Sequence, residues 1–241
     1  MMSILHSSAP KWPLVVYFHH VSPVVDHYTS LTPDSFRRGV EVILESFTPT
    51  GFDEIACADG SFSAPDRPAV LFTFDDGYAD LLDDAVAELD SRGVRAVFFV
   101  CTELVGRRSA EPRESYLSWP ELADLAAAGH TIGSHGRTHR ALTGLPEAEA
   151  RREVTDSLAD LRARLRIKYP AYAYPYGLVR PLPDRIDGFS GPLTAFGTVK
   201  SDPDDWAAAP RAIRRVYLPA DDEAAWPGLV RQWRRNWEGH Q

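Results

Sequence analysis

Short apolar runs alternate along the chain with segments in which apolar residues recur every three to four positions. The runs are typical of buried strands, and the spaced segments are typical of amphipathic helices. Strands are expected at 14–18, 68–72, 96–100, 131–132, 171–174, 194–199 and 216–218. Helices are expected at 34–47, 79–91, 120–128, 146–166 and 223–237. Repeated β-α units of this kind predict a parallel sheet in an α/β fold.

The composition fits a globular protein, and we expect one catalytic domain over residues 1–241. Of the 241 residues, 44% are hydrophobic and 25% are charged, which is enough for one sizeable core. The formal net charge of −8 argues against a nucleic-acid partner. No run approaches the roughly 20 apolar residues of a membrane span, and the first residues lack the features of a signal peptide. We therefore expect no membrane span and a cytoplasmic location. The oligomeric state is left open.

Two adjacent carboxylates, Asp75 and Asp76, stand where the apolar run at 68–72 gives way to polar residues. Neighbouring side chains on extended backbone point in opposite directions, so the two carboxylates can have different partners. Gly77 follows them and can adopt the positive φ that a sharp turn often needs. Burying two carboxylates without partners would cost several kcal/mol each. A partner is therefore implied, and a metal ion is the first candidate.

Two histidines lie about sixty residues further on, in the segment 133–139. His135 and His139 are four positions apart and can converge on one ion if the chain turns helically after His135. One carboxylate and two imidazoles make a three-ligand site with an open position for water, as in catalytic zinc sites. The alternative is that the histidines cap a loop and the aspartates cap the helix that begins near Tyr78. Because each motif stands at a strand end, together they favour the metal site.

With the segment 173–177, the motifs at 73–77 and 135–139 resemble those of the NodB-homology polysaccharide deacetylases, or carbohydrate esterase family four, in order and spacing. The resemblance extends over about residues 14–219. It implies an irregular (β/α) barrel with fewer than eight parallel strands, with the motifs at the carboxyl ends of the strands. It also implies metal-dependent removal of acetyl groups, N-acetyl first, from a carbohydrate or small glycoside.

The resemblance also implies roles for individual residues. One divalent ion, expected to be Zn²⁺, is held by Asp76, His135 and His139. Asp75 stays off the metal as the general base, and the backbone N–H of Tyr176 stabilises the oxyanion. The residues expected to contact substrate are Tyr174, Pro175 and His20.

Two departures from the common pattern bear on the catalytic acid and on the orientation of the base. Many family members carry an arginine at the position of Ala173 and a Leu-x-His motif near the C-terminus, and this chain has neither; His240 lacks that context. The sequence at 173–177 most resembles that of the poly-N-acetylglucosamine deacetylase branch, whose acid histidine lies in an N-terminal Tyr-His-x-Val motif. Aligning 18–21 with that motif makes His19 the acid, facing the metal, with His20 pointing away. Otherwise the histidine pair is a chance surface feature.

The missing arginine has three possible replacements just before the strand expected at 216–218. One of Arg211, Arg214 and Arg215 is expected to orient Asp75 through a bidentate contact, unless all three belong to a surface edge. Two other functions stay open. One is a metal-dependent amidase or deacylase that acts on a non-carbohydrate C–N bond, and the other is a non-catalytic sugar-binding relative.

Overall fold

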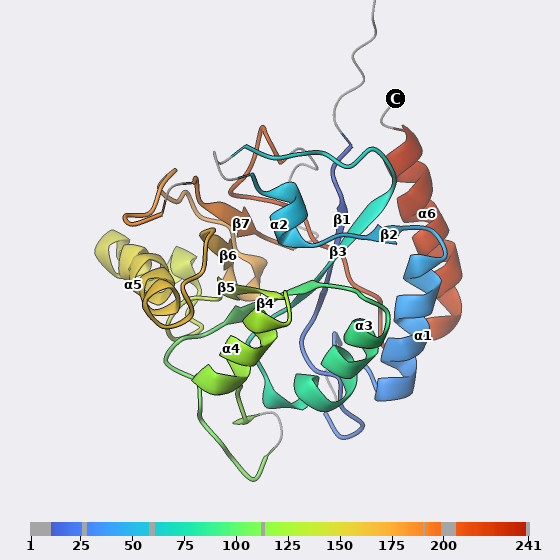
Figure 1. The fold of residues 1–241 in the computed structure, drawn as a ribbon, viewed down its shortest axis with the longest axis horizontal. Helices are drawn as coiled ribbons and strands as arrows, with labels where there is room; N and C mark the ends of the chain where they lie inside the picture. The colour runs from blue at the N-terminus through green and yellow to red at the C-terminus, as the bar shows by residue number, and fades with distance from the viewer. Residues whose placement is uncertain are drawn as a thin grey trace, which may run out of the picture.

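A curled, parallel β-sheet forms the centre of the molecule (Figure 1). The computed structural model describes residues 11–25, 28–57, 61–111, 114–189, 191–198 and 206–239. The strands of the sheet in these ranges are β1 (Leu14–Phe18), β2 (Thr48–Pro49), β3 (Ala69–Phe74), β4 (Ala96–Val100), β5 (Thr131–Ser134), β6 (Ala171–Ala173) and β7 (Thr194–Phe196). Their order is β1-β3-β4-β5-β6-β7, and the short β2 pairs with the start of β3. This is the α/β barrel with fewer than eight strands that the motifs imply.

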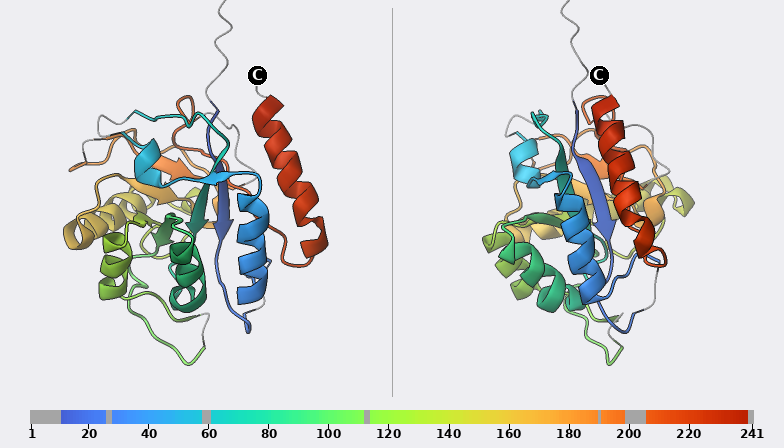
Figure 2. Two further views of the ribbon diagram at one scale, coloured as in Figure 1. Left: turned by 45° about the vertical axis from the view of Figure 1, so that its right-hand side comes forward. Right: turned by 90° about the vertical axis from the view of Figure 1, so that its right-hand side faces the viewer.

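Helices cover the outer face of the sheet, as the two further views show (Figure 2). They are α1 (Pro33–Leu44), α3 (Ala87–Ser91), α4 (Trp119–Ala127), α5 (Glu147–Leu165) and α6 (Trp226–Gly239). The short α2 (Phe52–Ile55) instead packs Phe52 and Ile55 against residues of the inner face. Helices α1 and α6 lie side by side, and the hydroxyl of Ser35 donates to Glu223 just before α6. Within the described ranges, no helix combines the length and the apolar character that crossing a bilayer requires.

Side chains alternate between two buried layers along each central strand. In β3, Val70, Phe72 and Phe74 belong to the core that the strands share with the helices. Leu71 belongs instead to a second cluster, which it shares with β1, β4, β6 and β7. This alternation is the two-residue period of extended backbone, and a strand buried on both faces is therefore apolar throughout. Thr73 and Asp75 stand two and four residues after Leu71, so the same alternation places them on the inner side of the sheet with Leu71.

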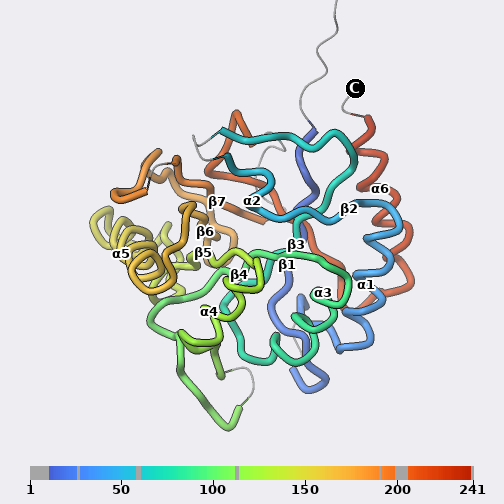
Figure 3. The backbone as a smooth tube through the Cα atoms, viewed as in Figure 1, coloured from blue at the N-terminus to red at the C-terminus, as the bar shows by residue number. Residues whose placement is uncertain are grey.

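The chain after β7 does not form the strand expected at 216–218. Instead, residues 212–218 form an irregular segment that lies between β7 and β1, as the tube drawing shows (Figure 3). Gly197 N–H donates to the carbonyl of Ile213, and Tyr17 N–H donates to the carbonyl of Val216. Each neighbour is contacted over too few consecutive residues to build a ladder, so only isolated bridges form. Irregular backbone thus connects the two ends of the curled sheet.

The helix expected at 79–91 is also different in the structure. It begins as a 3₁₀ turn over Ala79–Leu81, continues as a π-helical turn over Leu82–Val86, and becomes α-helical only in α3. Tyr78 pairs with Tyr116, and Ala79 N–H donates to the carbonyl of Ser115. The backbone at the start of this segment is therefore bonded to a neighbouring loop. These bonds hold it out of the α-helical conformation that the sequence predicted for the first turn. The strand expected at 194–199 ends at Phe196 in β7, and its last expected residue, Val199, lies outside the described residues, as does His240.

Candidate functional site

The three sequence motifs meet at one end of the sheet. Asp75 and Asp76 follow β3, His135 follows β5, and Tyr174 follows β6. The strands are parallel and hydrogen-bonded in order, so their carboxyl ends lie on the same edge. Asp75 N–H donates to the carbonyl of Phe18, which connects the end of β3 to the end of β1. The ends of four strands therefore supply the candidate site.

The side chains of Asp76, His135 and His139 converge at this edge. Asp76 Oδ1 lies 3.1 Å from His139 Nε2 and 3.4 Å from His135 Nε2. One possible ligand atom from each residue lies within 4.8 Å of the others. His135 Nδ1 lies 2.8 Å from the carbonyl oxygen of Ala173, which can only accept a hydrogen bond, so Nδ1 carries the hydrogen and donates. Its Nε2 is therefore left as the bare nitrogen, as in histidines that bind a metal.

The charge states of Asp76 and His135 suit a cation, and His139 carries a proton that a cation would have to replace. Burial lowers the pKa of His135 to about 4, so the imidazole is neutral near pH 7. For Asp76, burial alone would raise the pKa, but the hydrogen bond with His139 and the charge of His135 hold it well below its usual value. For His139, burial acts to lower the pKa, but the carboxylate of Asp76 raises it above the ordinary value. A neutral imidazole and an ionised carboxylate are the forms that coordinate metals, so His135 and Asp76 are already in those forms, whereas His139 must lose its proton to bind.

The neighbouring carboxylate, Asp75, has a different partner. It is 3% exposed and accepts two hydrogen bonds from the fully buried Arg215, at 2.7 Å from Nη1 to Oδ1 and 2.8 Å from Nη2 to Oδ2. Arg215 also donates from Nη1 to Thr73 Oγ1 and from Nε to the carbonyl of Gly197. Its guanidinium carbon lies 4.9 Å from the centre of the Tyr17 ring. The arginine is therefore fixed on every side and can hold Asp75 in a single orientation.

Of the three arginines proposed from the sequence, the structure thus selects Arg215. Arg211 pairs with Asp184, and Arg214 is exposed. Burial alone would raise the pKa of Asp75, but the charge of Arg215, with a contribution from His135, holds it below its ordinary value. Asp75 is therefore ionised and bonded to Arg215, and it is not one of the three residues of the cluster.

Three residues of the site have left-handed backbone conformations. The φ angles are 68° at Asp76, 62° at His139 and 60° at Tyr176. Among the described non-glycine residues, the only other is Arg166, at the C-terminal end of α5. This conformation costs an L-residue roughly 1–2 kcal/mol, so the surrounding contacts must impose it. Such strain is characteristic of functional sites, and here it is concentrated at the three motifs.

The histidine pair after β1 divides between two environments. His19 Nδ1 lies 2.8 Å from Thr29 Oγ1, and His19 is close enough to the aspartates for its charge to lower the pKa of both Asp75 and Asp76. His20 is buried, stacks on Tyr78 with ring centroids 3.6 Å apart, and bonds through Nδ1 to Asp80 at 2.7 Å. His20 therefore has little surface left for a substrate.

The residues of the third motif also divide. Tyr174 is fully buried, and its hydroxyl shares its one hydrogen between the carbonyls of Arg180 and Arg211, at 3.0 Å and 2.9 Å. Pro175 is buried as well, so neither side chain offers a face to a sugar in this arrangement. Tyr176 is 64% exposed, and its ring lies 4.7 Å from that of His139. An open aromatic face therefore stands beside the cluster, at the residue for which the sequence indicated only a backbone role.

Glu153 is a residue of this region that the sequence did not indicate. It lies on α5 and is 7% exposed, in contact with the loop between His135 and His139. A signal was present, because position 153 falls on the apolar face of the helix, next to Val154 and one turn after Ala150. A carboxylate on such a face indicates a buried polar partner.

Comparison with known proteins agrees with the motifs. The sequence profile described as "Polysaccharide deacetylase" matches residues 63–184, about half of the chain. The chain belongs to the polysaccharide deacetylase family. The match covers the two aspartates, both histidines and the segment 173–177, which are the residues that the structure brings to one edge of the sheet.

Individual relatives of this deacetylase family extend the comparison. A Bacillus subtilis (strain 168) protein named as a polysaccharide deacetylase, YxkH, is 32% identical over 93 residues, which are 39% of this chain and 31% of that protein. This likeness therefore concerns less than a third of the relative. IcaB from Ammonifex degensii has a similar structure, with a TM-score of 0.74 and 23% identity over 94% of this chain and 98% of the other. For the Streptococcus pyogenes deacetylase PplD, the TM-score is 0.71 at 20% identity, with the same coverage. These two structures share the fold.

Proposed function

We propose that the protein is a metal-dependent hydrolase that removes acetyl groups, N-linked first, from a carbohydrate. One observation carries the proposal: the adjacent carboxylates Asp75 and Asp76 have different partners. Asp76 joins two histidines in a cluster suited to a cation, while Asp75 is held apart by an arginine. A structural pair of helix-capping aspartates would need neither arrangement. Family membership adds the substrate class, and the acetate in the PplD structure has the chemistry of the expected product.

The residues of the cluster fit a divalent metal ion, and Zn²⁺ is the expected one. Asp76, His135 and His139 offer one oxygen and two nitrogen ligands, the usual donor set of catalytic zinc. The carbonyl of Ala173 orients the His135 ring so that Nε2 faces Asp76. When bound, such an ion supplies Lewis acidity, which lowers the pKa of water and polarises a carbonyl group.

In this proposal Asp75 is the general base that accepts the proton of the attacking water. The role requires an ionised carboxylate in a fixed direction, and Arg215 provides both properties through its two hydrogen bonds. The pKa of Asp75 is held low by Arg215 against the effect of burial. Asp75 is therefore only a modest base, so much of its contribution to the rate has to come from its fixed position relative to the water.

Two further groups complete the reaction. The tetrahedral oxyanion needs a hydrogen-bond donor, and we assign this role to the backbone N–H of Tyr176, which lies in the left-handed turn beside His139. The leaving amine needs a proton, and we assign the acid role to His19. Thr29 holds one nitrogen of the His19 ring, and the ring lies near both aspartates. The ordinary pKa of histidine permits proton donation near neutral pH.

The experiment is an acetate-release assay with chitin oligosaccharides, O-acetylated xylan and N-acetylated amino acids as substrates. The protein is first stripped of metal by a chelator and then titrated with Zn²⁺ or Co²⁺. Acetate release from the sugars that requires one equivalent of metal supports the proposal. Metal-dependent release from the amino acids alone would indicate an amidase of another class. A protein that binds sugar and releases no acetate with any metal would be a non-catalytic relative.

A further inference from the structure

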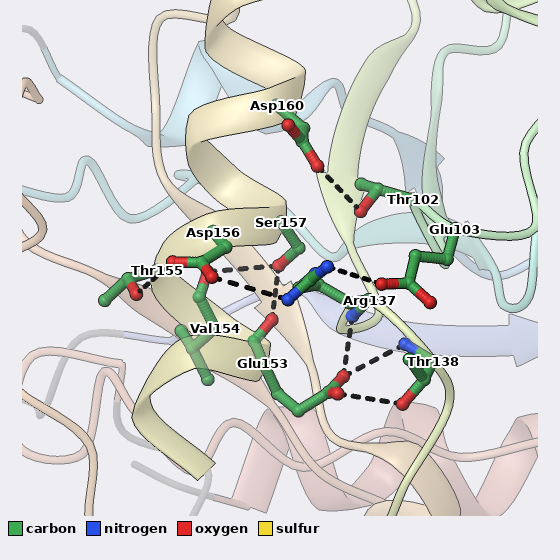
Figure 4. Close-up of polar contacts among 10 residues, drawn as sticks. All are labelled: Thr102, Glu103, Arg137, Thr138, Glu153, Val154, Thr155, Asp156, Ser157 and Asp160. Atoms are coloured by element: carbon green, nitrogen blue, oxygen red, sulfur yellow. Dashed lines mark hydrogen bonds and ion pairs between the residues drawn. The ribbon is translucent and has the colours of Figure 1, made fainter. Parts of the chain in front are cut away.

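A buried carboxylate contacts the loop that joins the two histidines. Glu153 extends from α5 toward Arg137 and Thr138 (Figure 4). Its Oε2 accepts hydrogen bonds from the backbone N–H of Arg137 at 2.8 Å and of Thr138 at 3.0 Å. Its Oε1 accepts the hydroxyl of Thr138 at 2.8 Å. One side chain thus satisfies three donors within two consecutive loop residues.

The loop is shaped to receive this carboxylate. Gly136 has φ +86°, and a Cβ atom placed there would lie 3.1 Å from Glu153 Oε2. A side chain at position 136 would therefore both strain the backbone and press on the carboxylate. His139 then takes a left-handed conformation immediately after the two residues that Glu153 holds. The conformation that brings His139 back toward Asp76 begins at these bonds.

Other contacts of the loop are of a different kind. Arg137 pairs through its side chain with Glu103 and Asp156, which are both partly exposed, and such pairs contribute little to stability. On the other side, Ser134 bonds to Ser157 at 2.6 Å and accepts the N–H of Gly136 at 3.0 Å. These contacts fix the start and the outer edge of the loop. Glu153 is the buried contact to its middle.

The environment of Glu153 gives it no cationic partner. Within the described ranges, none of the lysine, arginine or histidine side chains forms an ion pair with it, and its three donors are neutral groups. Burying a carboxylate without a cationic partner costs free energy unless its hydrogen bonds are well formed. A buried carboxylate of this cost indicates a role beyond packing, and among the described residues its side-chain hydrogen bonds lead to the loop of the histidine ligands alone.

We propose that Glu153 is a positioning residue: by holding Arg137 and Thr138 it sets His139 in the orientation that binds the metal. This inference rests on the proposed function, since it concerns the ion that Asp76, His135 and His139 would hold. Outer contacts of this kind commonly change metal affinity by about 10–100-fold when they are removed. The effect comes from hydrogen-bond geometry, so it follows the reach of the side chain and not its charge.

The test measures Zn²⁺ affinity by competition with a chromophoric chelator, starting from metal-free protein. Glu153→Asp keeps the charge and withdraws the carboxylate, whereas Glu153→Gln keeps the length and one oxygen for the two amides. The expected loss of affinity is about 10–100-fold for Glu153→Asp and Glu153→Ala, and no more than about threefold for Glu153→Gln. Glu149→Gln is the matched control, because Glu149 lies one helical turn away and pairs with Arg140 at the surface. It should bind Zn²⁺ as the wild type does.

A second readout needs no metal. Amide hydrogen exchange at Arg137 and Thr138 in the metal-free protein should become faster in Glu153→Asp and stay near wild type in Glu153→Gln. The proposal is overturned if folded Glu153→Asp binds Zn²⁺ as tightly as the wild type, or if Glu153→Gln loses as much affinity as Glu153→Asp. A wild-type protein that binds no Zn²⁺ would refute the metal site itself, and this role of Glu153 with it. Tight wild-type binding with unaffected variants would refute only the role of Glu153.

Discussion

Replacing Arg215 by methionine tests the arrangement of the catalytic base. The change keeps an apolar side chain of similar length between Tyr17 and Phe99, both of which pack on the guanidinium. It removes the two hydrogen bonds to Asp75 and leaves that carboxylate buried without a charged partner. Two results follow from this: the protein loses stability, and the pKa of Asp75 rises because burial is no longer opposed by the arginine.

The magnitude can be worked from the burial of the pair. Arg215 is 0% exposed and Asp75 is 3% exposed, so solvent screens neither group. Removing one partner of a buried ion pair costs about 3–5 kcal/mol. A protein of this size loses about 2–4 °C in Tm per kcal/mol, so the Tm should fall by roughly 6–20 °C. In the double variant Asp75→Asn, Arg215→Met, neither charge of the pair is left buried, so it should be more stable than Arg215→Met alone.

The assay is denaturant unfolding followed by tryptophan fluorescence, together with the pH dependence of acetate release. Arg214→Met is the matched control, since Arg214 is the exposed neighbour in the chain. The rate of Arg215→Met should rise with pH over a higher range than that of the wild type, because a base with a raised pKa loses its proton at a higher pH. An unfolding free energy within about 1 kcal/mol of wild type, with an unchanged pH profile, would refute the reasoning.

Three further predictions concern single histidines and the base. Asp75→Asn should fold and bind Zn²⁺ but lose about 10²-fold or more in turnover, and near-normal acetate release would assign the base elsewhere. His19→Ala should lose turnover far more than His20→Ala with one N-acetyl substrate, and equal losses would leave the acid unassigned. His130 is buried and accepts the N–H of Ala96 through Nδ1, and burial lowers its pKa. As the pH falls, His130 is therefore protonated in the unfolded chain before it is protonated in the folded protein. The free energy of unfolding measured with urea should decrease from pH 7 to pH 5, and this decrease should be smaller in His130→Gln.

The sequence predicted the parts of this molecule that depend on local pattern. The apolar runs gave β1 and β4 with their observed bounds, and the helical spacing gave α4 and α5 to within one residue at each end. The polar residues at the ends of β3 and β5 indicated the cluster, because parallel strands bring their carboxyl ends together. Both kinds of signal are carried by neighbouring residues, so they can be recognised without the fold.

What the sequence could not give depends on contacts between distant segments. Nothing local distinguishes Arg215 from Arg211 or Arg214; the choice is made by the irregular crossing from β7 to β1. The two-residue β2 and the four-residue α2 are too short to have a periodic pattern. Tyr174 looked like a sugar-stacking residue because an aromatic at a strand end fits either a core or a surface. The structure places it in the core.

The central claim is that Asp75 and Asp76 have different partners, and a crystal structure of the protein with Zn²⁺ tests it most directly. Anomalous scattering at the zinc edge locates the ion independently of the protein coordinates. We expect one ion at about 2.0–2.2 Å from single atoms of Asp76, His135 and His139. Asp75 should remain bonded to Arg215 and make no bond to the ion. An ion bound elsewhere, or one that draws Asp75 away from Arg215 into its coordination, would contradict the account.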